Sequence, residues 1–508
     1  MADTPTAHQD ALRLAAQIRE RPDLIDPATA AEAGVDLLHS LEPDARTEDL
    51  RLVTGLVGFA VRTAPDHPSV SRWWAELGFA HGRVAEKIDS AAEYGTAIAC
   101  SLTAVSAPQA PPVVAERAAV DAANLTGSLL RSGAVTAERA RQLIKTLDEL
   151  SLSWTEALNA VHFEFARAWA LRWSYPLTSD VAELVRAADI LRRTLTAPVL
   201  TEAAEDSVEG WDLLATVLEQ LYVAKPDLTL LEEALGAAVK VRDLLPEDHE
   251  WLPEAHGVVA AMAEEIFWNS DGEASAFLET AVTSFAAKRA AIGLDDDETV
   301  SYALLLQARG CTEEDVSALS DAVEILQTPE RAPGAEAVLA GLHELLIRFK
   351  GPQHAWQTID WTTRALARTD LGPEVVTPLH GSRIIGLTVA LEAFGGGEVA
   401  SRYDVDAILA AARNEAMASE DAAHAELGFQ TTQLRGQWEA DRFPLDTDRA
   451  QATSVEMADA LRRMRAYADE DHQPKLAAVA TLIEDMVPAV MGDRDPGPVR
   501  AALQDASL

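Results

Sequence analysis

The sequence predicts an all-α fold, a right-handed α-solenoid of about ten antiparallel helical hairpins with units near 45 residues. Hydrophobic residues make up 48% of the chain and aromatic ones only 6%, and the β-branched and aromatic runs typical of strands are scarce. The passage TAPDHPSVSRWWAELG at residues 63–78 returns as LLPEDHEWLPEAHG at 244–257, and faintly as EDHQPKLA at 470–477. Turn-forming residues, mostly prolines, also recur about every 45 residues. Such copying is typical of an array in which each unit buries its apolar face on its neighbour.

The first helices have clear start and stop signals. A helix over 7–19 is followed by Asp26-Pro27, a good helix start, and a second helix ends near Leu41. A third helix over 48–62 carries Leu50, Val53, Leu56, Val57 and Val61 at helical spacing. We expect residues 1–46 to cap the array.

Pairs of helices then follow the first copied turn. We expect them at 69–86 with 90–105, 113–132 with 136–149, 154–174 with 180–195, 203–223 with 228–244, 252–268 with 273–291, 298–309 with 313–328, 334–350 with 353–369, 374–394 with 403–416, 420–440 with 452–468, and 474–490 with a terminal helix. The triple glycine at 395–397 is the predicted flexible point, and 441–448 is the predicted long loop. We therefore expect the repeats to divide into 47–394 and 395–508.

Two further features recur with the turns. Six glycines lie inside predicted helices, roughly 10 to 20 residues after a turn: Gly78, Gly127, Gly257, Gly341, Gly381 and Gly428. Glycine inside a helix costs about 1 kcal/mol relative to alanine, so its repeated use predicts close helix packing. His67, His249 and His472 occupy the same place in the copied turn, which predicts a repeated structural hydrogen bond, because a catalytic histidine would not need copies.

Composition excludes several classes of partner. The chain has 82 acidic and 42 basic residues, a formal net charge of −40, so we expect neither nucleic acid nor an anionic membrane as a partner. Only seven of the basic residues are lysine, which hints at a GC-rich bacterial genome or a salty habitat. The start of the sequence has no signal-peptide pattern, and the longest apolar run, 52–61, is far shorter than the ~18 residues of a membrane span. Two cysteines are too few for a disulfide framework. We expect a soluble cytoplasmic protein.

One unit carries a resemblance to a known family. Trp74, Leu77, Gly78 and His81 follow the W-x-x-L-G-x-x-Y spacing of a tetratricopeptide repeat, with His in place of Tyr. In the same register Ser90, Tyr94 and Ala97 stand where that family has Ala, Phe and Ala. The Pro-Asp-His-Pro turn and the long units resemble the repeat arrays of actinobacterial proteins that accompany caspase-like peptidases. The resemblance implies a peptide-binding or protein-binding array; HEAT-type helical pairs remain the alternative.

Motifs for phosphate and metal binding are incomplete. The sequence contains no G-x-x-x-x-G-K-[ST] loop. His343-Glu344 begins an H-E-x-x-H motif, but Ile347 replaces the second His, so we expect a partly exposed helix histidine instead. Asn269, Asp271 and Gly272 resemble part of a calcium loop that lacks its first Asp and last Glu.

Two other candidate groups also have plain structural explanations. The acidic run 295–298 stands where a helix N-cap is expected, and Cys100 is expected to be a small packed residue. We predict no catalytic, cofactor-binding or metal-ligating residue and no cofactor.

The candidate binding residues lie on the predicted helix 154–174. Phe165, Trp169 and Trp173 are spaced at i, i+4 and i+8 and are flanked by Arg167 and Arg172. Aromatic residues at this spacing are usually core. Trp and Arg also dominate protein contacts, so the alternative is an anchor for a peptide or protein partner.

Three hypotheses for function follow. The first is an interaction scaffold or regulatory subunit that binds a peptide or protein partner through a helical-repeat groove. The second is an enzyme of unfamiliar type with a cavity inside the curled array, which requires ionisable groups with shifted pKa values. The third is a sensory arm that controls a separately encoded peptidase or ATPase.

Overall fold

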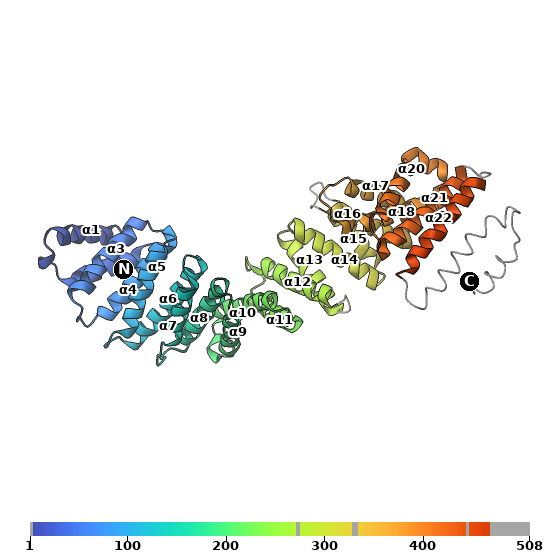
Figure 1. The fold of residues 1–508 in the computed structure, drawn as a ribbon. Helices are drawn as coiled ribbons and strands as arrows, with labels where there is room; N and C mark the ends of the chain where they lie inside the picture. The colour runs from blue at the N-terminus through green and yellow to red at the C-terminus, as the bar shows by residue number, and fades with distance from the viewer. Residues whose placement is uncertain (1–3, 271–274, 328–333, 443–446, 468–508) are drawn as a thin grey trace. The chain divides into compact units, whose positions relative to one another are not determined.

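The fold is all-α, as the sequence predicts. A computed structural model describes residues 4–270, 275–327, 334–442 and 447–467 (Figure 1). Within these ranges the chain forms 22 α-helices and two short 3-10 helices, and no strand. The contacts between residues divide the chain into two compact units, residues 1–277 and 278–508.

Unit 1 is a row of helical hairpins. Its helices are α1 (Thr4–Glu20), α2 (Pro27–Ser40), α3 (Thr47–Thr63), α4 (Val70–Ile88), α5 (Ala91–Ser106), α6 (Pro112–Arg131), α7 (Ala137–Asp148), α8 (Ala157–Thr178), α9 (Val181–Thr194), α10 (Ala204–Ala224), α11 (Leu228–Leu244) and α12 (Leu252–Asn269), with the 3-10 helices η1 (Pro22–Leu24) and η2 (Pro198–Thr201). Each helix from α1 to α12 packs on the next, and α4, α6, α8 and α10 also pack on one another in turn. The hairpins are therefore stacked, as in a solenoid.

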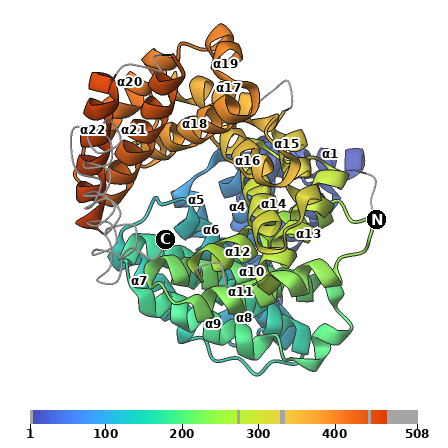
Figure 2. The same ribbon diagram turned by 90° about the vertical axis from the view of Figure 1, so that its right-hand side faces the viewer.

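Unit 2 follows the same rule with one irregular step. Its helices are α13 (Ser275–Ala291, which begins just before the division), α14 (Asp296–Thr312), α15 (Val316–Leu326), α16 (Ala335–Lys350), α17 (His354–Leu366), α18 (Pro373–Phe394), α19 (Gly396–Arg402), α20 (Val405–Ala416), α21 (Ala422–Arg442) and α22 (Thr447–Arg465). Here α18 contacts α20 and α21 directly, and α21 pairs with α22 (Figure 2).

Helix extends into two of the predicted connections. At the triple glycine, Gly395 ends α18 at a φ of 83° and Gly396 begins the short helix α19, whose Val399 is fully buried in the core of unit 2. Helix α22 begins at Thr447, inside the predicted loop 441–448. The expected helices and copied turn beyond residue 468 lie outside the described residues.

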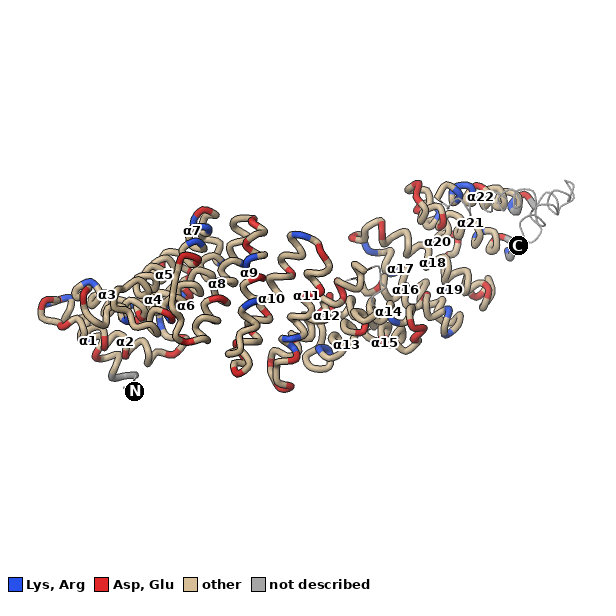
Figure 3. Tube along the Cα trace, turned by 90° about the horizontal axis from the view of Figure 1, so that it is seen from below, with Lys and Arg blue, Asp and Glu red and all other residues tan. Residues whose placement is uncertain are grey.

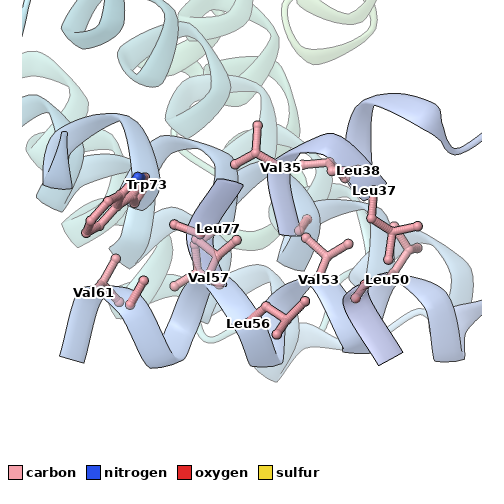
Figure 4. Close-up of a cluster of buried hydrophobic side chains, with 14 of the residues drawn as sticks. Val35, Leu37, Leu38, Leu50, Val53, Leu56, Val57, Val61, Trp73 and Leu77 are labelled. Carbon is pink, nitrogen blue, oxygen red and sulfur yellow. The ribbon is translucent and has the colours of Figure 1, made fainter. Parts of the chain in front are cut away.

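The apolar side chains predicted on the third helix form a core with its neighbours. Leu50, Val53 and Val57 are fully buried and point toward α2 and α4 (Figure 4). Trp73 of α4 belongs to the same cluster. Full burial of one such side chain contributes roughly 1.5–3 kcal/mol, so the contact between hairpins is a main source of stability.

The copied turn holds a copied hydrogen bond. The backbone N–H of Ser69 donates to Nδ1 of His67 at 3.1 Å, and the N–H of Trp251 donates to Nδ1 of His249 at the same 3.1 Å. The prediction of a structural histidine is thus confirmed at both turns, and His472 lies outside the described residues. In each turn the donor is the residue immediately before a new helix, Ser69 before α4 and Trp251 before α12.

Close packing at the helix glycines is confirmed at two of the predicted positions. A Cβ at Gly78 would lie 2.5 Å from Oγ of buried Ser101, and one at Gly127 would lie 2.1 Å from Cε3 of Trp169. At Gly341 and Gly381 the prediction is wrong, because a Cβ would meet only the end of a glutamine side chain at 3.7 or 3.9 Å. Gly428 faces the flexible end of Arg463.

Replacement of Gly78 by alanine is expected to destabilise the α4–α5 hairpin by about 1–3 kcal/mol, because its Cβ would lie 2.5 Å from Oγ of Ser101 and 3.1 Å from backbone atoms of α5. Gly95→Ala on the same hairpin is the control. A Cβ there would meet nothing within 4 Å, so the better helix propensity of alanine should stabilise by up to ~1 kcal/mol. Amide hydrogen exchange over α4 and α5 measures the change in local stability for both variants. Equal effects of the two variants would contradict the packing argument.

Candidate functional site

A cavity of about 560 Å³ opens between the helices of unit 1 that carry the predicted aromatic residues. We call it the α8 groove and define it by its lining: Val120, Asn124, His162, Phe165, Ala166, Trp169, Arg172, Asp206, Glu209, Asp212, Leu213, Thr216 and Trp251. The lining comes from α6, α8 and α10 and from the residue that caps α12. Residues widely separated in sequence thus meet in one hollow.

Glycines on the flanking helices seat the two aromatic rings of the groove. Trp169 lies against Gly127 of α6, and Phe165 lies against Gly210 of α10, where a Cβ would come within 2.4 Å of its Cζ. Phe165 is only 8% exposed, so it belongs to the core and shows an edge to the groove. Trp169 is half-buried, with the Arg131 guanidinium 5.8 Å from its ring.

Three of the five predicted binding residues, Phe165, Trp169 and Arg172, line this groove together. Among the described residues, Arg167 and Trp173 are not part of the lining: Arg167 pairs with Glu164 at 3.0 Å, and Trp173 stacks under the Arg172 guanidinium at 4.8 Å. Helix geometry explains the position of Arg167, which lies on a different face of α8 from the lining residues.

The opposite wall of the groove is a row of acids that our sequence analysis missed. Asp206, Glu209, Asp212, Leu213 and Thr216 of α10 face the cavity. The sequence could have pointed to this face of α10, because 206, 209, 213 and 216 are spaced by three, four and three residues in a predicted helix that contains no Lys or Arg. The sequence did not show that this face would share a cavity with the aromatic face of α8.

Two of the charged side chains in the groove, Arg172 and Asp212, are partly buried. Burial lowers the pKa of the Arg172 guanidinium, although Asp212 and Glu219 oppose the shift. Burial also shifts the pKa of the Asp212 carboxyl, which it raises, although the Arg172 guanidinium opposes this shift. Nε of Arg172 is buried without a hydrogen-bond partner among the described residues. His162 contacts Asp206 at 2.7 Å.

The copied turn also contributes to the groove. Trp251, whose backbone N–H is held by His249, packs beside the Val208–Val241–Ala255 cluster and lines the cavity. The structural hydrogen bond of the turn therefore fixes one end of the groove.

A buried carboxylate holds the loop that leads into α8. Glu116 of α6 is 1% exposed, and each of its two oxygens accepts two hydrogen bonds. The donors are the N–H and hydroxyl of Thr155, the N–H of Glu156 and the amide of Asn159, at 2.5 to 3.3 Å. These bonds lower the pKa of Glu116 to about 2. The start of α8, and with it the groove, is positioned by this one side chain.

The Glu116 contacts predict a pH-dependent loss of stability. Because the folded pKa is about 2 and the ordinary value is 4.5, the stabilisation is complete above pH 4.5 and disappears as the pH falls through 2. Glu116→Gln should lower the urea midpoint at pH 7, since its amide N–H₂ would oppose two of the four donors. The deficit relative to wild type should shrink between pH 4.5 and pH 2. Glu138→Gln, at an exposed site on α7, should show no such trend; a constant deficit for Glu116→Gln would refute the assignment.

Unit 2 contains the polar cluster that looks most like a catalytic centre. The Thr377 hydroxyl lies 3.2 Å from Nε2 of His424, whose Nδ1 lies 2.7 Å from Asp421. A hydroxyl, an imidazole and a carboxylate in this order occur in hydrolases. Here, however, Thr377 donates its single proton to Glu415 at 2.7 Å and is only 5% exposed. The cluster is better described as a buried hydrogen-bond network that links α18, α20 and α21.

The remaining predicted motifs have structural roles. His343 is 4% exposed, so the prediction of a partly exposed histidine is wrong. Helix α17 packs on α16 there, and Nδ1 of His354 lies 3.1 Å from Nδ1 of His343. Asp295 and Glu298 form the predicted N-cap as a reciprocal capping box, and Cys100 is packed as expected. The described residues contain no group of three metal-ligating side chains, and none of their helices could span a membrane.

Comparison with known proteins adds little to this geometry. No protein-family model matches the chain, and no curated protein matches it. Among solved structures it is similar to a "Circular tandem repeat protein with novel repeat topology and enhanced subunit contact surfaces", with 14% identity, 99% of this chain and 97% of that chain covered, and a TM-score of 0.18. A TM-score of this size carries no argument. The chain is a helical-repeat protein because its own hairpins stack.

Proposed function

We propose that this helical-repeat protein is an interaction scaffold or regulatory subunit, and that the α8 groove takes a segment of a peptide or protein partner. The observation that supports this most is the meeting of Phe165, Trp169 and Arg172 on one cavity whose opposite wall is polar. Partly buried aromatic and Arg side chains at the centre of a hollow are the residues that dominate protein contacts. A ring held on a glycine, as Trp169 is, loses little entropy when it is covered.

The lining favours binding over catalysis. It contains no Ser, Cys or Lys, and its one hydroxyl, on Thr216, donates to the backbone carbonyl of Asp212 at 3.0 Å. Arg172 and Asp212 have shifted pKa values, as the enzyme hypothesis requires, but neither has a nucleophile beside it in the groove. The enzyme and the sensory arm remain alternatives. Affinity purification from the native host separates them: a stoichiometric partner favours the scaffold or the arm, and a lone protein with a bound metabolite favours the enzyme.

Filling the groove should weaken binding. The probe is a displayed library of random 12-residue peptides selected on the full chain, followed by affinity measurement with synthetic copies. Asn124 is exposed and lines the groove, so Asn124→Trp should weaken the selected peptides by about tenfold or more without disturbing the core. Gln142→Trp on α7, also exposed, is the matched control and should change affinity less than about twofold.

Two results would contradict the proposal. If selection enriches no peptide, the chain does not bind segments of this kind. If the enriched peptides bind both tryptophan variants as they bind wild type, the partner site lies elsewhere.

A further inference from the structure

We infer that the occupant of the α8 groove is a basic segment of a partner protein, with an Arg or Lys side chain seated between the aromatic rings of α8 and the carboxylates of α10. This inference rests on the proposed function and adds the chemistry of the partner. It is carried by the charge of the groove walls, which the aromatic residues alone did not reveal.

The α10 wall is acidic without compensation from its own helix. Over its 21 residues α10 contains five acids and no Lys or Arg: Glu205, Asp206, Glu209, Asp212 and Glu219. Three of these, Asp206, Glu209 and Asp212, line the groove at i, i+3 and i+6. Helix α11 carries Lys240 and Arg242, neither of which lines the groove, and α12, whose N-cap Trp251 does line it, contains acids and no Lys or Arg. Acidic residues outnumber basic ones along the described trace in general (Figure 3), but α10 aims its row into a cavity.

The lining holds more acid than base. Three carboxylates stand against one guanidinium, that of Arg172, whose electrostatic partners include Asp212, and His162 contacts Asp206. Glu209 is exposed at the groove, and its carboxylate has no hydrogen bond or ion pair among the described residues. It is thus the carboxylate most open to a new partner. An anionic segment would instead meet three carboxylates, which like-charge repulsion makes costly.

The apolar part of the lining suits the stem of a basic side chain. Lys and Arg lay their methylene chains along apolar surface and keep the charged end near water or carboxylates. Trp169 offers a half-buried ring, which the Arg131 guanidinium already approaches to 5.8 Å, and Val120 of α6 and Leu213 of α10 extend the apolar lining. A cation near such a ring gains a further contribution when it is partly desolvated. The groove therefore places apolar surface next to carboxylates.

Reversing the charge of Glu209 tests the inference. In the peptides selected on the full chain, we expect Lys and Arg to be enriched over the unselected library. Glu209→Lys should weaken those peptides by about tenfold or more, and Glu209→Gln should weaken them less but in the same direction. The control is Glu232→Lys, an exposed charge reversal on α11 outside the groove lining, which should change affinity less than about twofold. Equal melting temperatures for all variants establish that each is folded.

Each outcome supports or overturns a distinct statement. Selected peptides that are neutral or acidic, yet are blocked by Asn124→Trp, would overturn the basic partner and leave the binding groove intact. Equal losses for Glu209→Lys and Glu232→Lys would show attraction to the acidic body in general, which also overturns the inference. Failure to select any peptide that depends on the groove would overturn the proposed function itself. Basic peptides that lose affinity only with the Glu209 variants would support both.

Discussion

Within each unit, the described hairpins bury their apolar sides against the neighbouring hairpins, and the structure depends on how closely those neighbours approach. The core that joins α2, α3 and α4 shows the principle, with Val53 and Val57 of the middle helix buried from both sides. Where backbones approach most closely, the contact residue is glycine, as at Gly78 against Ser101. In an array of this kind each repeat contacts its neighbours, so stability is set locally, at each contact between neighbouring hairpins.

The α8 groove depends on two such close contacts between helices, one with α6 and one with α10. Gly127 and Gly210 leave room for rings that alanine would exclude, so Trp169 and Phe165 can lie between helices and still reach a cavity. Phe165 and Trp169 therefore both pack between helices and line the cavity. Their position also depends on Glu116, whose four hydrogen bonds fix the loop that leads into α8.

Hydrogen bonds elsewhere also hold neighbouring segments together. The repeated turn histidines accept backbone hydrogen bonds at partly or fully exposed turns, and the buried Thr377–His424 cluster links three helices of unit 2. In that cluster the bonds satisfy groups that burial would otherwise leave unpaired, which is the general requirement for polar groups in a packed interior. Resemblance to a catalytic triad is therefore not evidence of chemistry when the hydroxyl proton already has an acceptor.

The sequence by itself determined the helices, because the period of the apolar residues, the prolines and caps such as Asp295 are local properties that the chain carries wherever it folds. It also placed three groove residues on one helix. Only the tertiary structure decided what faces them: whether a residue is buried, as His343 is by α17, or opposed by acids, as Trp169 is by α10, depends on elements distant in sequence. Periodicity defines a face of a helix, whereas the approach of another helix defines the environment of that face.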